Sequence, residues 1–170
     1  MDRYPHPMPK LNTTQAVRLL EAKRVAHRVI VYDESAAFHS AEDAASLIGA
    51  HVDAVYKTLV VLRQDAPSER PLIVMIRADA ELDLKLLASA LDAKKLRMAR
   101  REAEALTGME VGGISALALQ KPSSFDIFLD DAARSLDKIY VSAGARGIEI
   151  ELSVDDLVRV TNARIVRATG

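Results

Sequence analysis

The sequence contains no cysteine, and this absence excludes three kinds of chemistry at once. The chain can form neither a disulfide framework nor a thiolate zinc site, and it has no cysteine nucleophile. Its four histidines never have the H-x-x-x-H or H-x-H spacing of a metal site; they are His6, His27, His39 and His51. We therefore expect a protein with no metal and no cofactor.

Long hydrophobic runs and an excess of one charge are also missing. No apolar run approaches the roughly 20 residues of a membrane span, and the N-terminus lacks the basic-then-apolar pattern of a secretory signal. We expect no membrane partner and a cytoplasmic location. The 23 lysines and arginines nearly balance the 24 aspartates and glutamates, so the chain has no global basic field for nucleic acid. Any nucleic-acid contact must be local, weak or shared with a partner.

The pattern of the chain predicts one α/β (α+β) domain with a curled mixed sheet and surrounding helices. With 170 residues and 49% hydrophobic content, the chain can bury the core of a single domain. Residues 1–12 include three prolines and are expected to form a loosely ordered arm, and residues 13–170 to form the domain. Helices are expected at 13–24, 40–49, 84–91, 100–106 and 157–161, and strands at 27–32, 57–62, 72–77, 96–98, 125–129, 139–142, 148–152 and 164–166.

Some of these elements carry more specific signals. The continuous apolar runs 57–62 and 72–77 are typical of central strands covered on both faces. Ser40 and Ser153 each begin a capping-box-like pattern, Asp83 can cap the helix that follows it, and Thr13 or Thr14 can cap the first helix. Residues 144–147 read as the turn of a hairpin.

Two short segments are candidates for a binding pocket. In Val111-Gly-Gly-Ile-Ser115, the paired glycines let a ligand reach backbone N–H groups that can hold a carbonyl or phosphate oxygen. In Val55-Tyr-Lys-Thr-Leu59, Lys57 offers a fixed positive charge to a phosphate or carboxylate. Each segment also has an ordinary interpretation, because Gly-Gly is usually a turn and a lysine at a strand end is usually solvated.

Five motifs, taken in order, resemble the YbaK group of trans-editing aminoacyl-tRNA deacylases, the bacterial Cys-tRNA(Pro) deacylases. The resemblance runs from about Thr14 to about Val166. The motifs are Val55-Tyr-Lys-Thr-Leu-Val-Val61, Leu82-Asp-Leu-Lys85, Val111-Gly-Gly-Ile-Ser115, Ile139-Tyr-Val-Ser142 and Arg146-Gly-Ile-Glu-Ile-Glu-Leu152.

The resemblance implies a free-standing relative of the insertion editing domain of prolyl-tRNA synthetase, with a mixed sheet curled around a small pocket. Its implied reaction is hydrolysis of a mischarged aminoacyl-tRNA, with Cys-tRNA(Pro) as the first substrate. The implied partners are tRNA(Pro) and, in addition, prolyl-tRNA synthetase.

The resemblance also implies roles for individual residues. Lys57 matches a lysine that engages the terminal adenosine or its phosphate, and Gly112 matches a glycine whose backbone N–H approaches the scissile carbonyl. We expect these two as catalytic residues. The expected substrate-binding residues are Tyr32, Phe38, Gly113, Ser115, Asp130, Ser142 and Glu149.

The chain departs from the family pattern at three positions near this site. Ala116 and Ala118 replace a proline and a glycine of the family, and Glu149 stands where YbaK proteins commonly have aspartate. The amino acid removed therefore stays open between cysteine and alanine or another small residue. A non-catalytic module that binds a nucleotide or an amino acid is the alternative of a different class.

The chemistry can be considered without the family. An aminoacyl ester is already activated, so hydrolysis needs its oxygen polarised, its acyl group confined and a nucleophile nearby. The N–H groups of Gly112 and Gly113 could stabilise the developing oxyanion. No histidine lies in the motifs that carry the glycines or Lys57, so a substrate-assisted route is favoured over a protein nucleophile.

Several residues have structural interpretations beside the functional ones. Ser115 beside a glycine pair more often bonds its own turn than attacks a substrate. Asp130 and Asp131 more often cap a helix than act as acid and base. Glu149 and Glu151 should share one strand face, which is solvent-exposed unless the pocket lies there.

Two further candidates concern charge. His51 could be a general base, but a histidine after a helix is more often a helix-end cation. The best local candidate for tRNA contact is the basic cluster, and a solvated basic face explains it equally well; its members are Lys94, Lys95, Arg97, Arg100 and Arg101.

Overall fold

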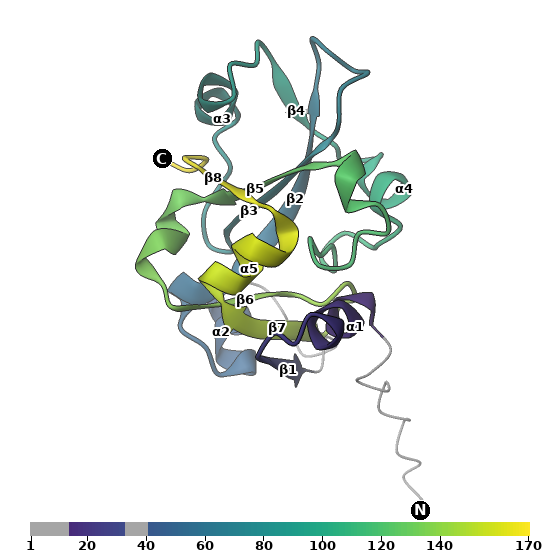
Figure 1. Ribbon diagram of the computed structural model, residues 1–170. Coiled ribbons are helices and arrows are strands. Elements are labelled where there is room, and N and C mark those ends of the chain that lie inside the picture. The colour runs from purple at the N-terminus through teal and green to yellow at the C-terminus, as the bar shows by residue number, and fades with distance from the viewer. Residues whose placement is uncertain (1–13, 33–40) are drawn as a thin grey trace, which may run out of the picture.

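The computed structural model describes residues 14–32 and 41–170 (Figure 1). The predicted arm at 1–12, the pocket candidate Phe38 and the capping candidate Ser40 lie outside the described residues. Within the described ranges, no helix is both long and apolar enough to cross a membrane.

The strands form two sheets rather than the single sheet expected from the sequence. The smaller sheet is antiparallel in the order β1-β7-β6, with β1 at His27–Val31, β7 at Ile148–Ser153 and β6 at Lys138–Ser142. The larger sheet has the order β4-β2-β3-β5-β8, with β4 at Leu96–Met98, β2 at Tyr56–Arg63, β3 at Leu72–Arg77, β5 at Asp126–Asp130 and β8 at Arg164–Val166. It is mixed, because β5 runs parallel to both β3 and β8.

The alternation in β7 shows which face of the smaller sheet is buried. Ile148, Ile150 and Leu152 are buried, whereas the glutamates between them are only partly covered. A strand with one apolar face packs that face against a core and leaves the other accessible. The two sheets share that core, and Val55 forms a parallel bridge to Tyr140 that joins them.

Helices begin at the capping residues that the sequence predicts. Thr14, Asp83 and Ser153 each accept a hydrogen bond from the backbone N–H three residues later. The α-helices are α1 at Gln15–Ala22, α2 at Ala41–Ile48, α3 at Leu84–Ala90, α4 at Ala103–Thr107 and α5 at Val154–Thr161. Short 3₁₀ turns occupy Val52–Ala54, Pro122–Ser124 and Asp131–Ser135.

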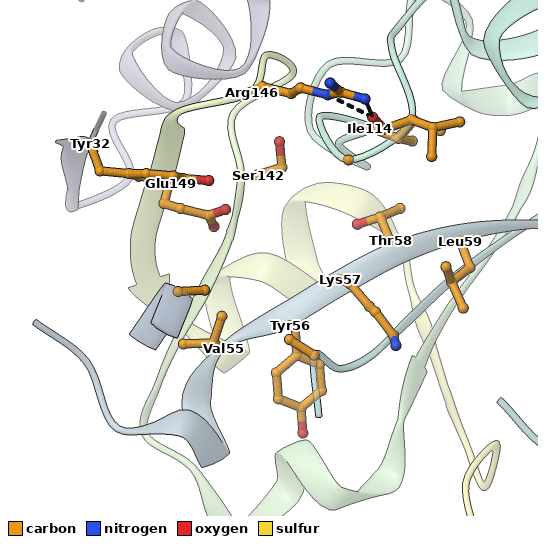
Figure 2. Close-up of a pocket in the computed structure, with 14 residues that line it drawn as sticks. Tyr32, Val55, Tyr56, Lys57, Thr58, Leu59, Ile114, Ser142, Arg146 and Glu149 are labelled. Carbon is orange, nitrogen blue, oxygen red and sulfur yellow. Dashed lines mark hydrogen bonds between the residues drawn. The ribbon is translucent and has the colours of Figure 1, made fainter. Parts of the chain in front are cut away.

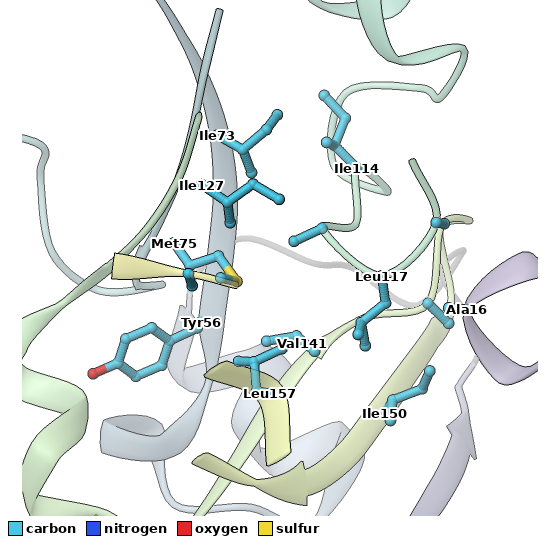
Figure 3. Packing of buried hydrophobic residues seen from close by; sticks show 14 of the residues in the cluster. Ala16, Tyr56, Ile73, Met75, Ile114, Leu117, Ile127, Val141, Ile150 and Leu157 are labelled. Atoms are coloured by element: carbon cyan, nitrogen blue, oxygen red, sulfur yellow. The ribbon is translucent and has the colours of Figure 1, made fainter. Parts of the chain in front are cut away.

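The main core lies between the two sheets. Figure 3 shows Ile73, Met75 and Ile127 of the larger sheet approaching Val141 and Ile150 of the smaller one. Leu72, Val74 and Ile76 face a second cluster on the other side of β3. This confirms that β3 is a central strand covered on both faces.

The same prediction is wrong for the first half of β2. Tyr56, Val60 and Val61 are buried, but Lys57, Thr58 and Leu59 are only partly covered. The reason is that β4 pairs with β2 only from Val61 onward, which leaves the earlier part of that edge without a strand. This open edge is where the cavity described below lies.

Candidate active site

A cavity of about 570 Å³ lies beside the open edge of β2 (Figure 2). Its walls come from both sheets and from the loop that carries the paired glycines. β2 contributes Lys57, Thr58 and Leu59, the smaller sheet contributes Ser142 and Glu149, and the glycine loop contributes Val111, Gly112 and Ile114. Tyr32 and Arg146 also line it. The structure therefore brings together Lys57, Gly112, Tyr32, Ser142 and Glu149, which the sequence had proposed for one site.

The backbone of β2 also presents polar groups to this cavity. The carbonyl of Val60 accepts a bond from the N–H of Ala99, which lies just beyond β4. In an antiparallel sheet, the N–H and C=O of one residue point to the same side, and residues two apart share that side. Thr58 therefore directs its N–H and C=O to the open edge, where the cavity lies.

Gly112 and Gly113 have different structural roles. Gly112 lines the cavity at a φ of +90°, and no acceptor for its N–H lies among the described residues. The N–H of Gly113 instead donates to the carbonyl of Glu110 at 2.9 Å. A Cβ on Gly113 would stand 2.8 Å from the backbone nitrogen of Arg146, so this glycine permits close packing of two loops. Gly113 is thus not the second oxyanion donor that the sequence suggested.

Ser142 of β6 and Arg146 of the turn after it hold the glycine loop in place. Ser142 Oγ donates to the carbonyl of Gly113 at 2.9 Å and accepts from the N–H of Gly144. Arg146 donates from Nε and Nη2 to the carbonyl of Val111, at 3.0 and 2.8 Å. Sequence reasoning gave Arg146 no role, although the residue stands in one of the motifs of the resemblance.

Glu149 is the unusual ionisable group of the cavity. It pairs in register with Ser142 of β6 and Ile30 of β1, and Figure 2 shows its side chain near Ser142. Burial raises the pKa of its carboxyl to about 8, and Oε2 is buried without a hydrogen-bond partner among the described residues. At neutral pH the carboxyl is therefore largely protonated and uncharged.

Lys57 also borders the cavity, on the other side of β2. Figure 2 shows Thr58 on the side of the strand that faces Ser142, and Lys57 on the opposite side. The pKa of the Asp79 carboxyl is lowered chiefly by hydrogen bonds from Arg77, and the positive charge of Lys57 adds to this effect. Lys57 is therefore a cation at the margin of the cavity rather than an ion partner of Glu149.

Ser115 and Asp130 do not line this cavity. Ser115 is fully buried and its Oγ accepts from the N–H of Leu117, which confirms the interpretation as a turn residue. Asp130 is also fully buried, and its oxygens accept bonds from Ala132, Ala168 and Thr169. This confirms the capping interpretation and corrects the expectation that Asp130 contacts substrate. Its partners at the C-terminus are 38 and 39 residues away, so no local pattern could reveal them.

Neither of the two alanines that replace family residues lines the cavity. Ala116 and Ala118 are buried members of the main core. A Cβ on Gly144 would lie 2.9 Å from the Cβ of Ala118, so Ala118 packs against the hairpin loop. These substitutions therefore alter the packing behind the glycine loop and not its cavity-facing side.

The charged alternatives lie outside the cavity as well. His51 accepts from the N–H of Asp53 and caps the short turn before β2. In the basic cluster, Arg97 pairs with Glu102 at 2.7 Å, whereas Arg100 and Arg101 are exposed. Figure 1 shows β4 at the end of the larger sheet that is far from β1 and β7. The described part of the chain contains no group of three acidic or histidine side chains able to hold a metal ion.

The fold and the cavity define a class of protein: a small α+β domain whose pocket combines a backbone N–H donor, a cation and an uncharged carboxyl. The family model of the aminoacyl-tRNA editing domain matches residues 35–160, and the chain belongs to this family. This confirms the resemblance seen in the sequence and the predicted class of enzyme, an aminoacyl-tRNA deacylase.

Individual relatives agree with this assignment. The chain is 33% identical, over 157 residues, to EbsC of Enterococcus faecalis, a protein named as a proposed Cys-tRNA(Pro)/Cys-tRNA(Cys) deacylase; the match covers 92% of this chain and 93% of EbsC. A crystal structure of hypothetical protein APE2540 has a TM-score of 0.79 at 27% identity, covering 92% of this chain and 99% of that one. A structure described as a proposed trans-editing enzyme for prolyl-tRNA synthetase has a TM-score of 0.77 and covers 92% and 95%. At 20% identity, the latter supports the fold alone.

Proposed function

We propose that this deacylase removes cysteine from mischarged tRNA(Pro), in trans and in the cytoplasm. The observation that carries the proposal is the position of Gly112, whose N–H has no acceptor among the described residues and borders a cavity of small-ligand size. The name of EbsC supports the choice of cysteine and tRNA(Pro) as the first substrate.

In the proposed reaction, the carbonyl oxygen of the ester accepts a hydrogen bond from Gly112. This bond strengthens as negative charge develops on the oxygen, and one such donor is worth about 10²–10³ in rate. A water molecule held by the substrate attacks the carbonyl, or a group of the substrate attacks first and water then hydrolyses the new acyl bond. Either route consumes one water, which supplies the proton for the leaving oxygen. Once the ester bond breaks, the ribose oxygen takes a proton, and the products are the free amino acid and uncharged tRNA.

Other residues of the cavity orient the substrate in this proposal. Lys57 engages the terminal adenosine, and Tyr32 and Ser142 border the aminoacyl group. Glu149 faces the α-amino group; an ammonium beside this carboxyl favours its ionised form, so the pair forms as the substrate enters. Replacing Lys57 with alanine should then reduce hydrolysis and leave the melting temperature close to that of the parent, because Lys57 is only partly buried.

A smaller substrate, alanine on tRNA, is the second candidate. Glu149 is one methylene longer than the aspartate common in the family, and it occupies the wall of the cavity. A pocket discriminates by about 1–3 kcal/mol per methylene, so this extra length favours a smaller acyl group.

Binding of the tRNA is proposed to need help from prolyl-tRNA synthetase. The formal net charge of the chain is −1, and the basic cluster near β4 is partly neutralised by Glu102. Affinity for nucleic acid rises with the number of phosphates neutralised. A synthetase that already holds the tRNA would raise its effective concentration near the cavity.

A panel of purified substrates tests these proposals. Release of free amino acid is measured from Cys-tRNA(Pro), Ala-tRNA(Pro), Pro-tRNA(Pro) and Cys-tRNA(Cys), each with and without the synthetase. We expect fastest release from Cys-tRNA(Pro) and none from Pro-tRNA(Pro). Preferential release of alanine would favour the second candidate. Saturable binding of these substrates without any release would instead indicate the non-catalytic module.

A further inference from the structure

Arg146 lies in the turn between β6 and β7, at the edge of the cavity, and its guanidinium is only partly used by the protein. Nε and Nη2 both donate to the carbonyl of Val111 (Figure 2). A guanidinium carries further N–H groups, on Nη1 and on the second position of Nη2, in a rigid planar fork. These donors have no acceptor among the described residues, and the side chain is 54% exposed.

The free edge of Arg146, formed by Nη1 and the second N–H of Nη2, has no acidic partner among the described residues. The only ion partner of Arg146 among the described residues is Glu110, whose Oε2 lies 3.8 Å from Nε. That contact is long, and the Glu110 side chain is 75% exposed, so solvent screens it strongly. It also lies at Nε, the side of the guanidinium already turned to the glycine loop.

The charges around the cavity favour an anionic ligand at this position. Glu149 is largely uncharged at neutral pH because burial raises its pKa to about 8. Asp53 and Asp79 are both paired with Arg77, at 2.9 and 2.7 Å. Among the described residues that line the cavity, Lys57 and Arg146 are therefore the charged side chains at neutral pH, and both are positive.

The position of Arg146 relative to Gly112 narrows the choice of anion. A Cβ built on Gly112 would lie 3.3 Å from Nε of Arg146, so the guanidinium is adjacent to the proposed oxyanion donor. In an aminoacyl-tRNA, one ribose separates the ester from the phosphate on the 5′ side of the terminal adenosine. Arginine binds phosphate through paired N–H groups, which the free edge of Arg146 provides.

We infer that Arg146 binds this terminal phosphate with its free edge while its other edge holds the glycine loop through Val111. The inference rests on the proposed function, because it takes aminoacyl-tRNA as the substrate. Arg146 thereby links recognition of the nucleotide to the placement of the Gly112 N–H.

Two small substrates separate phosphate binding from loop positioning. They are 3′-O-aminoacyl-adenosine and its 5′-monophosphate, which differ only in the phosphate and carry the amino acid released fastest from tRNA. Arg146→Ala should raise KM for the monophosphate about 10- to 100-fold, as expected when a bond to a charged group is lost. For the nucleoside ester, KM should rise less than about threefold. Any fall in kcat that results from a displaced glycine loop should be the same for both esters. Arg146→Lys should recover part of the monophosphate effect, because lysine keeps the charge but lacks the paired donors.

Glu110, the ion partner of Arg146, provides a control variant. Glu110→Gln removes the neighbouring carboxylate. It should change KM and kcat for either ester by no more than about twofold, because an exposed pair contributes little. If Arg146→Ala reduces kcat/KM equally for both esters, Arg146 only positions the loop. If it reduces kcat/KM for neither ester, Arg146 neither binds the phosphate nor positions the loop. Both results overturn the inference.

A binding measurement keeps the inference separate from the proposed function. The parent protein should bind AMP about tenfold more tightly than adenosine, and Arg146→Ala should lose this preference. A parent protein with this preference but without deacylase activity would contradict the proposed substrate and retain the phosphate site. A parent protein without the preference would contradict the inference even if it is an active deacylase.

Discussion

Glu149 and Glu151 lie two residues apart on the same face of β7, yet their carboxyls have opposite properties. Glu149 faces the cavity, and burial raises its pKa to about 8. Glu151 is bonded to Arg28 and Tyr140 and lies near Lys138, and its pKa falls to about 2. Strand alternation places both on one face, but the neighbouring elements decide which carboxyl is charged. The cavity end of this face should therefore govern activity and lower the stability of the protein once its carboxyl ionises, whereas the ion-paired end should contribute to stability alone.

The largest effect is expected for Gly112→Ala, at the cavity end. Alanine is disfavoured at a φ of +90°, by about 1–2 kcal/mol, and its Cβ would press on Arg146. The N–H should shift from the position that the ester carbonyl needs, and kcat/KM should fall about 10²- to 10³-fold. Steady-state kinetics and thermal melting measure the two effects.

Gly108→Ala is the matched control for this change. Gly108 also has a positive φ, of +71°, but a Cβ there meets nothing within 4 Å and the residue does not line the main cavity. Gly108→Ala should lower the melting temperature about as much as Gly112→Ala does, but it should keep the deacylase activity of the parent protein. Equal activity losses in the two variants would mean that the fall comes from general destabilisation.

Glu149→Gln should remove a pH dependence that the parent protein shows. The folded-state pKa is about 8 against an ordinary value of 4.5, so the folded state binds the extra proton between these values. Parent stability should then decline as pH rises from about 4.5 through about 8, by up to a few kcal/mol, and stay level above that. The variant should lack this decline and be the more stable protein at pH 9. Urea unfolding at several pH values checks it, and a parallel decline in both proteins would place the titrating group elsewhere.

Glu151→Gln should show the opposite pH behaviour with a smaller effect. The folded-state pKa is lowered to about 2, so the stabilisation is present above about 4.5 and is lost as pH falls toward 2. Because the pair with Arg28 is partly solvated, we expect a loss of about 1 kcal/mol at pH 7 and no change in kcat/KM. A strong loss of activity in a stable Glu151→Gln protein would break the division between the two ends of β7.

The smallest effect on specificity is expected from restoring the family residues at two positions. Ala116 and Ala118 lie in the core behind the glycine loop and do not line the cavity. The double change Ala116→Pro with Ala118→Gly should alter the ratio of Cys-tRNA(Pro) to Ala-tRNA(Pro) hydrolysis by less than about threefold, well below the discrimination available from one methylene. Competition assays with both substrates measure this ratio. A larger change would show that the loop transmits core packing to the cavity.

Sequence patterns predicted the local features of this fold correctly. The capping roles of Thr14, Asp83 and Ser153 depend on residues three positions apart, so short patterns reveal them. The alternation of Ile148, Ile150 and Leu152 likewise reports which side of a strand is buried. The motifs with Lys57 and Gly112 were informative for the same reason, because each lies within a few residues along the chain.

The roles of single side chains within the cavity required the tertiary structure. The resemblance implied a substrate contact for Asp130, but the partners of this carboxylate come from the C-terminus. Arg146 had no predicted role until its contact with Val111, 35 residues away, was seen. The open edge of β2 depends on where β4 begins to pair, which the apolar run 57–62 does not encode.

The sequence by itself thus determined the elements, the family and the chemical types of residue available to the site. It could do so because helix caps, strand alternation and short motifs depend on neighbours along the chain. Only the tertiary structure decided that Glu149 is uncharged, that Gly113 serves packing and that Arg146 has a free edge beside Gly112. Burial, ion pairing and close backbone approach depend on residues that are distant in the sequence and meet only after folding.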